Sequence, residues 1–414
     1  MTNAPTIAVD VAIMGAGPVG GALACRLATA GLRVAVIDRA PLPPMEHPAY
    51  DGRAYAISAA MRPLLDQAGV WDKLPDPTCP ILDIRVSDGR VGRRASRLFL
   101  HFDHTEAGDT PFGWMVEARS LRRALNAHLH ALPDLHVFAP VSTEVVRSDD
   151  AAEIRIDGGP VLRCQLVIGA EGRQSSLRQS AGIGVARIPY GQTGMVCAIS
   201  HELPHNGVAL EHFLPGGPFA VLPMPASPDA IPGGAPHVSA VVWTERTKVA
   251  ETILRLDDAR FATEIRRRIG DYLGTVRPIG RRWSYPLSAM LVQRYTDTRL
   301  ALAGDAAHGI HPIAGQGLNL GFRDATALAG LLIEAHEAGE DLGAPALLAR
   351  YQRARRGDNL TMLAATDALD RLFSSDRPAV RLARDLGIAA VHRTPALKRF
   401  FMRSAMGLHA AGAE

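Results

Sequence analysis

The stretch GAGPVG carries residue types and spacing that could bind a large, partly negative ligand. Gly15, Gly17 and Gly20 form a GxGxxG pattern directly after an apolar run, and Asp38 closes the next apolar run. Glycines at this spacing allow a tight turn and let backbone N–H groups approach a pyrophosphate at a helix N-terminus. An acid at the position of Asp38 suits the ribose of a dinucleotide. The pattern therefore predicts a dinucleotide-binding βαβ unit over residues 9–38.

A second glycine-rich stretch, AGDAAHGIHPIAGQGLNLGFRD, spans residues 303–324. An apolar run predicts a buried strand that ends at Gly304 and Asp305, and apolar residues at helical spacing predict a long helix beyond Gly317. Unshielded N–H groups at such a helix entry favour an anion or an electron-rich ring edge. Two glycines alone would indicate only a tight turn. An acid, a proline, an amide and five glycines at one junction favour a binding site.

Three further charged residues stand beside predicted elements. Arg53 lies in a small-residue loop that leads into a helix predicted near residues 59–67, and Arg119 stands at the entrance of an amphipathic helix. Each could place a guanidinium near a cofactor phosphate. Glu171 follows a strand predicted at residues 164–168, where Gly-acid-Gly suggests ligand approach at the carboxyl edge of a sheet. The alternative for Arg53 is a surface arginine before a helix, and the alternative for Glu171 is a solvated charge in an ordinary turn.

Length and composition indicate a soluble globular protein with two subdomains. The chain has 414 residues, 47% of them hydrophobic, and a net charge of +3 that is too small to argue for nucleic-acid binding. The four cysteines are far apart, which is typical of a reducing cytosol. No secretory signal or membrane-length apolar run is evident. His308 and His311 lack a third ligand at a metal-site spacing, so no metal is expected.

Changes in the pattern of apolar and charged residues divide the chain into four segments. Residues 1–188 and 291–376 are predicted to form one α/β ligand-binding domain, in two parts. Residues 189–290 hold short runs typical of antiparallel strands and are predicted to form an inserted, sheet-based substrate domain. Residues 377–414 contain a basic, amphipathic stretch. It could rest on an anionic membrane surface or a partner, or pack as a terminal helix on its own domain.

The dinucleotide-binding unit would suit FAD or NAD. Flavoproteins with two Rossmann domains need a second GxGxxG fingerprint, and this sequence holds only one. That favours FAD at the N-terminal glycines, with any nicotinamide docking transiently. No histidine or cysteine stands at a position that argues for covalent attachment, so we expect non-covalent FAD.

Taken in order, GAGPVG, GRAYAIS, IGAEGRQS and GDAAHGIHPIAGQGLNLGFRD resemble the group A flavoprotein monooxygenases. The stretches HPIAGQGLNLGFRD, FLPGGPFAVLPMP and YPLSAM are similar to the UbiH/UbiF/VisC branch, the ubiquinone-biosynthesis hydroxylases. The resemblance covers nearly the whole chain. It implies an α/β fold like that of para-hydroxybenzoate hydroxylase. In that fold a Rossmann-type FAD domain of the glutathione-reductase kind lies beside a sheet-based substrate domain, and a helical C-terminal region follows.

The resemblance also implies roles for individual residues. The three N-terminal glycines would take the pyrophosphate and Asp38 the ribose, while Arg53 and Arg119 would approach the FAD and Asp305 the ribityl-pyrophosphate region. Glu171 stands where the family usually has Asp, which leaves the contacts of that acid open. The residues implied to line the isoalloxazine ring are Pro312, Gly315, Gln316, Gly317, Leu318 and Asn319. Pro312, Gly315 and Gln316 would form the catalytic environment, and no general base is identified.

The implied chemistry follows from the cofactor. NAD(P)H, or another electron donor, would reduce FAD, and O2 would form a flavin C4a-hydroperoxide whose distal oxygen a phenolic ring attacks. For this branch the ring carries a polyprenyl tail. The expected location is the cytoplasm, with peripheral docking at the inner face of the membrane, or in a quinone-biosynthesis complex, as a hypothesis.

Three alternatives remain at this point. A group A hydroxylase could act on another phenolic substrate. A flavin-dependent halogenase would carry a Trp-x-Trp-x-Ile-Pro stretch, which Trp71, Trp114, Trp243 and Trp283 do not form. If the protein were a non-catalytic, flavoprotein-like scaffold, its cofactor motifs should have decayed. The motif glycines and the acids Asp38 and Asp305 are all present.

Overall fold

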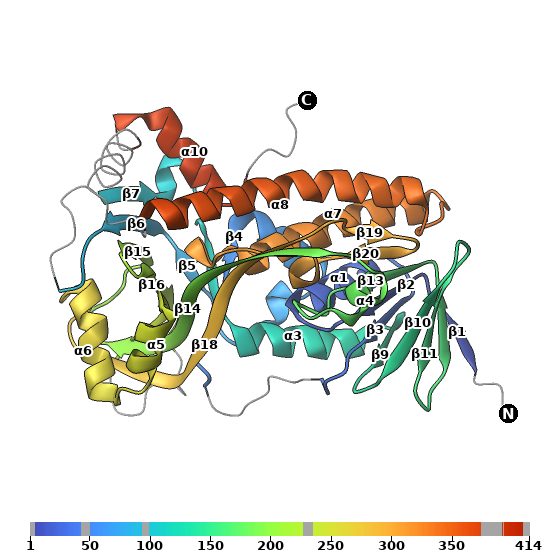
Figure 1. The fold of residues 1–414 in the computed structure, drawn as a ribbon, viewed down its shortest axis with the longest axis horizontal. Helices are drawn as coiled ribbons and strands as arrows, with labels where there is room; N and C mark the ends of the chain where they lie inside the picture. The colour runs from blue at the N-terminus through green and yellow to red at the C-terminus, as the bar shows by residue number, and fades with distance from the viewer. Residues whose placement is uncertain are drawn as a thin grey trace.

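Two sheet-based parts lie side by side along the long axis of the molecule, joined by long strands (Figure 1). The computed structural model describes residues 5–42, 50–92, 99–226, 235–373, 391 and 393–408. One part is a six-stranded, mostly parallel sheet with helices. The other is an eight-stranded, mostly antiparallel sheet.

The six-stranded sheet is built around the N-terminal βαβ unit. Its central strands are short, apolar and fully buried, as in a parallel sheet covered on both faces. The predicted unit is confirmed, with helix α1 (Pro18–Thr29) between its two strands. In spatial order the strands are β19 (Thr296–Asp297), β20 (Leu300–Leu302), β13 (Leu166–Gly169), β2 (Val11–Met14), β3 (Val34–Ile37) and β9 (Leu135–Phe138).

Helices α1, α3 (Ala118–Ala131) and α7 (Gly317–Glu337) pack together, and α8 (Pro345–Phe373) runs along α7 (Figure 1). Helix α1 ends as its glycine predicts, because Gly31 follows the last turn with φ +91°. Helices α1 and α7 approach closely where Gly321 lacks a side chain. A Cβ there would lie 2.5 Å from Val19 Cγ2.

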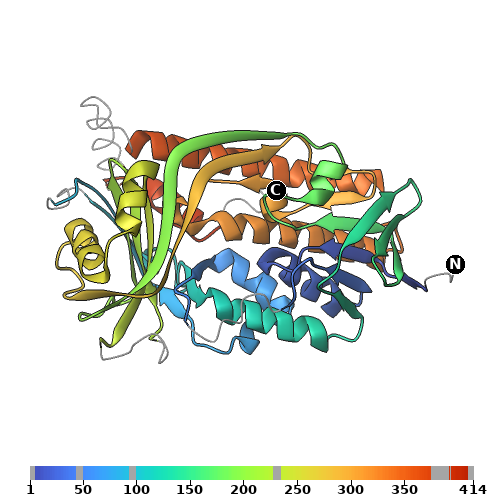
Figure 2. The ribbon, with the colours of Figure 1, turned by 60° about the horizontal axis from the view of Figure 1, so that its bottom comes forward.

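The eight-stranded sheet confirms the antiparallel strands predicted after residue 189. It also takes in two strands from the first part of the chain, through the parallel pairing of β15 with β6. Its order is β21 (His308–Gly309), β18 (Val276–Val292), β14 (Val185–His201), β17 (His237–Arg246), β16 (Gly217–Met224), β15 (Val208–Leu214), β6 (Asp83–Asp88) and β7 (Phe99–Asp103). Strands β14 and β18 are the long ribbon that connects the two parts (Figure 2).

Two helices that the sequence did not predict, α5 (Thr247–Leu254) and α6 (Asp258–Ile269), cover one face of this sheet around Trp243 and Phe261. The opposite face turns toward the six-stranded part. It therefore carries whatever side chains meet a ligand held between the two parts.

Smaller elements complete the fold. A three-stranded sheet has the order β4 (Ala54–Ser58), β8 (Gly113–Glu117) and β5 (Cys79–Ile81), and a four-stranded sheet has β1 (Thr6–Ala8), β12 (Val161–Cys164), β11 (Ala152–Ile156) and β10 (Thr143–Arg147). The short helices are η1 (Ala59–Met61), α2 (Arg62–Gln67), η2 (Trp71–Lys73), η3 (His104–Glu106), α4 (Ser176–Ser180), η5 (Gly304–Ala306), η6 (Ile313–Gly315) and α10 (Pro395–Ala405).

Two local predictions were wrong. The small-residue loop before residue 59 is strand β4, because antiparallel pairing with β8 satisfies its backbone. The single strand predicted at residues 164–168 breaks at Gln165 into β12 and β13, which belong to different sheets. In both cases the deciding partners are distant in sequence.

Of the basic C-terminal stretch the structure describes residues 391 and 393–408, so the parts of that prediction on residues 377–390, 392 and 409–414 lie outside the described residues. Helix α10 buries Met402, and Met406 just beyond it, among the apolar side chains around β7 and β8. Among the described residues, every helix is too short or too polar to cross a membrane.

Candidate cofactor and substrate site

The parallel strands end together at one edge of the six-stranded sheet. Met14 pairs with Ile37 on one side and with Gly169 on the other, and Gly169 pairs with Leu302. The residues that follow these strands are therefore brought to one place from four separate stretches of the chain. Ligands bind at such an edge in open α/β sheets.

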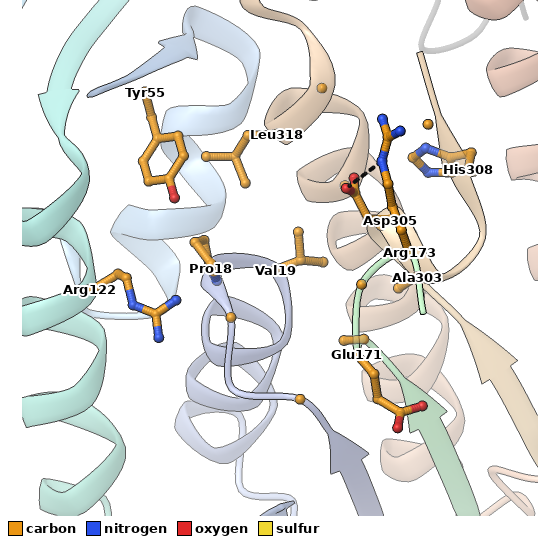
Figure 3. A pocket seen from close by; sticks show the side chains of 18 of the residues that line it. Pro18, Val19, Tyr55, Arg122, Glu171, Arg173, Ala303, Asp305, His308 and Leu318 are labelled. Carbon is orange, nitrogen blue, oxygen red and sulfur yellow. Dashed lines mark hydrogen bonds and ion pairs between the residues drawn. The ribbon is translucent and has the colours of Figure 1, made fainter. Parts of the chain in front are cut away.

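A cavity of about 850 Å³ lies at this edge, within the usual size of ligand sites. It runs from the glycine-rich turn to the inner face of the eight-stranded sheet. The predicted site residues that line it are Gly15, Gly17, Asp38, Glu171, Asp305, Pro312, Gly315, Gly317 and Leu318. Figure 3 shows the part between α1, α3 and the loop that precedes α7.

The three glycines of the N-terminal turn meet three different requirements. Gly15 has φ +104°, and a Cβ there would lie 2.5 Å from the backbone oxygen of Ala170. A Cβ at Gly20 would clash with the backbone oxygen of Gly15, so this glycine permits close packing of helix on strand. Gly17, by contrast, has ordinary backbone angles and no atom within 4 Å of a Cβ built on it. Its open side belongs to the cavity.

Asp38 lies beside this turn at the end of β3. Its Oδ2 accepts a hydrogen bond from the backbone N–H of Ala16 at 2.8 Å, and its Oδ1 accepts one from that of Ala40 at 2.9 Å. The carboxylate is thereby held at the rim of the cavity, where the sequence places a ribose-binding acid.

The structure places Arg53 and Arg119 outside the residues that line this cavity. Arg53 donates to Asp51 Oδ2 at 2.7 Å, and its guanidinium lies 3.9 Å from the ring centre of Trp283. Arg119 is buried and donates from Nε to Glu117 Oε2 at 2.8 Å. Their roles in cofactor binding stay predictions.

Arg122, one turn beyond Arg119 on α3, does line the cavity and points toward Pro18 (Figure 3). Its Nε is buried with no hydrogen-bond partner among the described residues. Burial lowers the pKa of Arg122, against the opposing effects of Tyr55 and Asp38. A buried cation that is short of acceptors favours an anionic ligand. Its i+3 spacing from Arg119 was the sequence signal that could have found it.

Glu171 lines the cavity wall, but its carboxylate turns away from the open space (Figure 3). Its Oε2 accepts from Ser175 Oγ at 2.6 Å and from the backbone N–H of Leu177 at 3.0 Å, and Oε1 accepts from Ser176 Oγ at 2.5 Å. These bonds satisfy N–H and hydroxyl groups at the start of α4. The geometry thus gives Glu171 a structural task beside any contact with a ligand.

Asp305 and Arg173 lie side by side in the wall of the cavity (Figure 3). Arg173 Nε lies 3.4 Å from Asp305 Oδ2, and both side chains are partly exposed. Arg173 Nη1 also donates to the backbone oxygen and Oγ of Ser288 on β18. Sequence reasoning singled out the acid and missed this arginine, whose partners are more than 100 residues away.

The loop before α7 contributes Pro312, Gly315 and Leu318 to the cavity, whereas Gln316 and Asn319 are not among its lining residues. Asn319 instead fastens α7 to β4. Its Oδ1 accepts from the backbone N–H of Ser58 at 3.0 Å and its Nδ2 donates to the backbone oxygen of Ala56 at 2.9 Å. It positions the helix start that faces the cavity.

Behind this loop a buried acid holds the wall in place. Asp324 Oδ2 lies 2.5 Å from His308 Nε2 and accepts from the backbone N–H of Gly304 at 2.9 Å, while its Oδ1 accepts from Arg355 Nε at 2.7 Å. Burial raises the pKa of Asp324, but the charges and hydrogen bonds of His308 and Arg355 outweigh it, and the pKa lies below its ordinary value. A fully bonded buried network of this kind rigidifies the site.

The two histidines lie apart from any metal-type arrangement. His308 lines the cavity and bonds to Asp324, and His311 is buried with its Nε2 3.1 Å from Gln192 Oε1. Within the described ranges, histidines, cysteines and acids form no cluster of three or more that could hold a metal ion.

Comparison with known proteins agrees with this geometry. Residues 8–364 match the model of the FAD binding domain family. The chain is 49% identical over its full length to ubiquinone hydroxylase UbiL of Rhodospirillum rubrum, of which it covers 93%. The chain belongs to the family of FAD-binding ubiquinone hydroxylases. It is also 36% identical to the 3-demethoxyubiquinol 3-hydroxylase of Escherichia coli, over 99% of this chain and all of that one.

The fold of this hydroxylase family member has a counterpart of known structure. The p-nitrophenol 4-monooxygenase PnpA of Pseudomonas putida superposes with a TM-score of 0.77 at 22% identity, covering 99% of this chain and all of that one. The expected fold, an FAD domain beside a sheet-based domain in an FAD-dependent aromatic-ring monooxygenase, is confirmed.

The geometry of the site also fits FAD, independently of these comparisons. The open side of Gly17 is a cradle that any Cβ would fill, and the buried Nε of Arg122 lacks an acceptor among the described residues. A pyrophosphate supplies acceptors and negative charge for both features.

Proposed function

We propose that this protein hydroxylates the aromatic ring of a polyprenylated phenol in ubiquinone biosynthesis, with O2 as oxygen source and NAD(P)H as reductant. The names of its relatives support the pathway. The observation that carries the proposal is the single cavity that joins the dinucleotide-binding turn to an apolar sheet face. A cofactor at one end and an aromatic substrate at the other would then meet at the loop before α7.

In this proposal the pyrophosphate of FAD binds at the N-terminus of α1, over Gly17, where the helix dipole and backbone N–H groups favour anions. Arg122 supplies a cation to the same group, and Asp38 accepts from the ribose hydroxyls. Asp305 binds near the ribityl chain, and the ring system lies against Pro312. Bound FAD supplies the activation of O2, and the protein supplies position and surroundings.

The substrate would lie against the apolar end of the cavity. Its lining there comes from four strands of the eight-stranded sheet, β14, β16, β17 and β18, namely Val196, Leu222, Val242, Tyr285 and Leu287. Apolar walls bind a phenolic ring and the start of a prenyl tail, and they exclude water from the reacting atoms.

The test uses the purified holoenzyme with ¹⁸O2, NADH or NADPH in separate reactions, and phenols with and without a short prenyl tail. We expect one labelled oxygen in the product and a preference for the prenylated phenol. A preference for the untailed phenol would support the alternative of another phenolic substrate. Absence of bound flavin, or of any labelled product with either reductant, would refute the proposal.

We further propose peripheral membrane association through α10. Arg399 and Arg403 are exposed on this helix beside Phe400 and Phe401, whose exposed fractions are 54% and 40%. Lys398, another basic residue of this C-terminal stretch, instead donates to Glu106 Oε1 at 2.6 Å. Exposed cations beside aromatic side chains suit an anionic membrane surface, where the lipid-soluble substrate would reside.

A further inference from the structure

One buried acid stands apart from all the polar contacts described above. Glu211 on β15 has an exposed fraction of 9%, and no described residue forms a hydrogen bond or an ion pair with it. Other buried acids are paired: Glu117 with Arg119, and Glu245 with Arg268. Burying a carboxyl group without a partner costs free energy, so such a group is expected where function needs it.

The sheet register puts Glu211 on the face that lines the cavity. Glu211 pairs with Ala220, Ala220 with Val242, and Val242 with Val196. Directly paired residues point to the same face of a sheet, and Val242 and Val196 both line the cavity. Ala220 stands between Glu211 and Val242 in this row, and its side chain is only a methyl group.

Leu222 is a cavity residue that lies nearer to Glu211 than Val242 does. Leu222, two positions beyond Ala220 on β16, is the diagonal neighbour of Glu211 and lines the cavity. Diagonal neighbours lie about 7–8 Å apart, within reach of a long side chain. Glu211 is not itself among the residues that line the cavity, but the register places it beside Leu222, at the apolar end of the site.

The same strand also touches the loop that would face the flavin ring. Phe213, two residues after Glu211 and on the same face, packs in one cluster with Ile313 and Phe373. Ile313 directly follows Pro312, which lines the cavity. Glu211 thus lies between the substrate end of the cavity and the loop at which oxygen transfer would occur.

We propose that Glu211 binds the phenolic hydroxyl of the substrate and accepts its proton during hydroxylation. This inference rests on the proposed function. The O–H bond breaks, the proton passes to the Glu211 carboxylate, and the electron pair left on oxygen makes the ring a better nucleophile. The ring carbon forms its new C–O bond with one oxygen atom of O2, which bound FAD would activate, as the O–O bond breaks; the second oxygen atom leaves as water with the two electrons that NAD(P)H supplies. The substituted carbon then loses its hydrogen as a proton to solvent. Glu211 then returns its proton to the ring oxygen, which leaves both groups as they began.

The electrostatics of the position suit this exchange. Burial raises the pKa of Glu211 to about 8. That value lies between the ordinary pKa of a glutamate and that of a phenol, about 10 for tyrosine. A proton can therefore pass from a phenol to Glu211 with a smaller difference in free energy than to an ordinary glutamate, and the carboxylate form that accepts it becomes more abundant as the pH rises toward 8.

The test compares Glu211→Gln with Glu245→Gln. Glu245 is a buried glutamate of the same sheet whose side chain faces the α5 and α6 side and pairs with Arg268. FAD content, flavin reduction by NAD(P)H and hydroxylated product are measured for each. Glu211→Gln should keep FAD and flavin reduction but lose roughly 10²- to 10⁴-fold in hydroxylation. Glu245→Gln should keep wild-type turnover per bound flavin.

The dependence of the Glu211→Gln defect on the acidity of the phenol separates a catalytic role from a purely structural one. Phenols with more acidic hydroxyls ionise unaided, so the defect of Glu211→Gln should shrink as substrate acidity rises. Wild-type turnover by Glu211→Gln, or a defect that is equal for all phenols, would overturn the inference. If Glu211→Gln fails to fold, Glu211→Ala takes its place, and unchanged turnover by that variant would overturn the inference equally. A wild type that hydroxylates no phenol overturns the proposed function as well.

Discussion

A methyl group at Gly17 should weaken FAD binding without disturbing the apoprotein. Gly17 has φ −62° and ψ 175°, which any residue adopts, and a Cβ built there meets no atom within 4 Å. In Gly17→Ala the methyl group would occupy the space in which a pyrophosphate approaches the backbone. Gly15→Ala would not serve, because its φ of +104° and its contact with Ala170 would strain the fold itself.

The size of the effect follows from the contacts that would be lost. A hydrogen bond from a backbone N–H to a charged group contributes about 1.5–3 kcal/mol. Loss of one such bond, about 1.5–3 kcal/mol, raises the Kd for FAD roughly 12- to 140-fold. Fluorescence titration of the apoprotein with FAD measures this change, and circular dichroism of the apoprotein should give the wild-type Tm.

A matched control makes the same chemical change elsewhere. Gly357 lies inside α8, has no atom within 4 Å of a built Cβ and does not line the cavity. Gly357→Ala should leave the Kd for FAD unchanged and add up to about 1 kcal/mol of helix stability. If Gly17→Ala binds FAD as tightly as wild type while the control behaves as expected, the placement of the pyrophosphate is wrong.

Other consequences are open to direct measurement. Glu171→Ala removes the acceptor of three hydrogen bonds and should cost about 1–3 kcal/mol in urea unfolding, whereas unchanged stability would show the carboxylate to be dispensable. Asp324→Asn removes the buried counter-charge of Arg355 and leaves it only the partly exposed Asp358, so it should cost about 3–5 kcal/mol, and a variant as stable as wild type would contradict the network. Burial lowers the pKa of His201 from 6.5 to about 4, so the neutral form is favoured on folding. Stability should therefore fall by up to about 1.4 kcal/mol per pH unit below pH 6.5, with a flatter profile for His201→Gln. Reversing Arg399 and Arg403 should release the protein from anionic vesicles, since each cation contributes about 1 kcal/mol, and equal co-sedimentation would favour a helix that only packs on its own domain.

Short-range patterns were enough to predict the elements whose residues are neighbours in sequence. The N-terminal βαβ unit, the glycine that ends α1 and the amphipathic helix α3 all follow from spacing within about one element, because helix and strand periodicity are local properties. The break at Gln165 did not follow, since the sheet that each half joins depends on partners elsewhere in the chain.

Arg119 and Arg122 show the limit within a single helix. Both arginines stand near the start of α3, and the sequence offers no reason to prefer one. Only the packed structure pairs Arg119 with Glu117 and turns Arg122 toward the turn that holds Gly17. Which of two arginines on one helix face meets the ligand depends on their neighbours, which are set by the tertiary fold.

By itself the sequence determined the cofactor class and the edge at which it binds, because glycine spacing and strand-ending acids constrain the backbone locally. It could not indicate Glu211, a glutamate within an apolar strand, as a candidate base. The importance of that residue depends on a row of pairs from β15 across β16 and β17 to β14, and on a loop about 100 residues later that reaches the same face. Sheet pairing and burial join these distant stretches, and they exist only once the chain has folded.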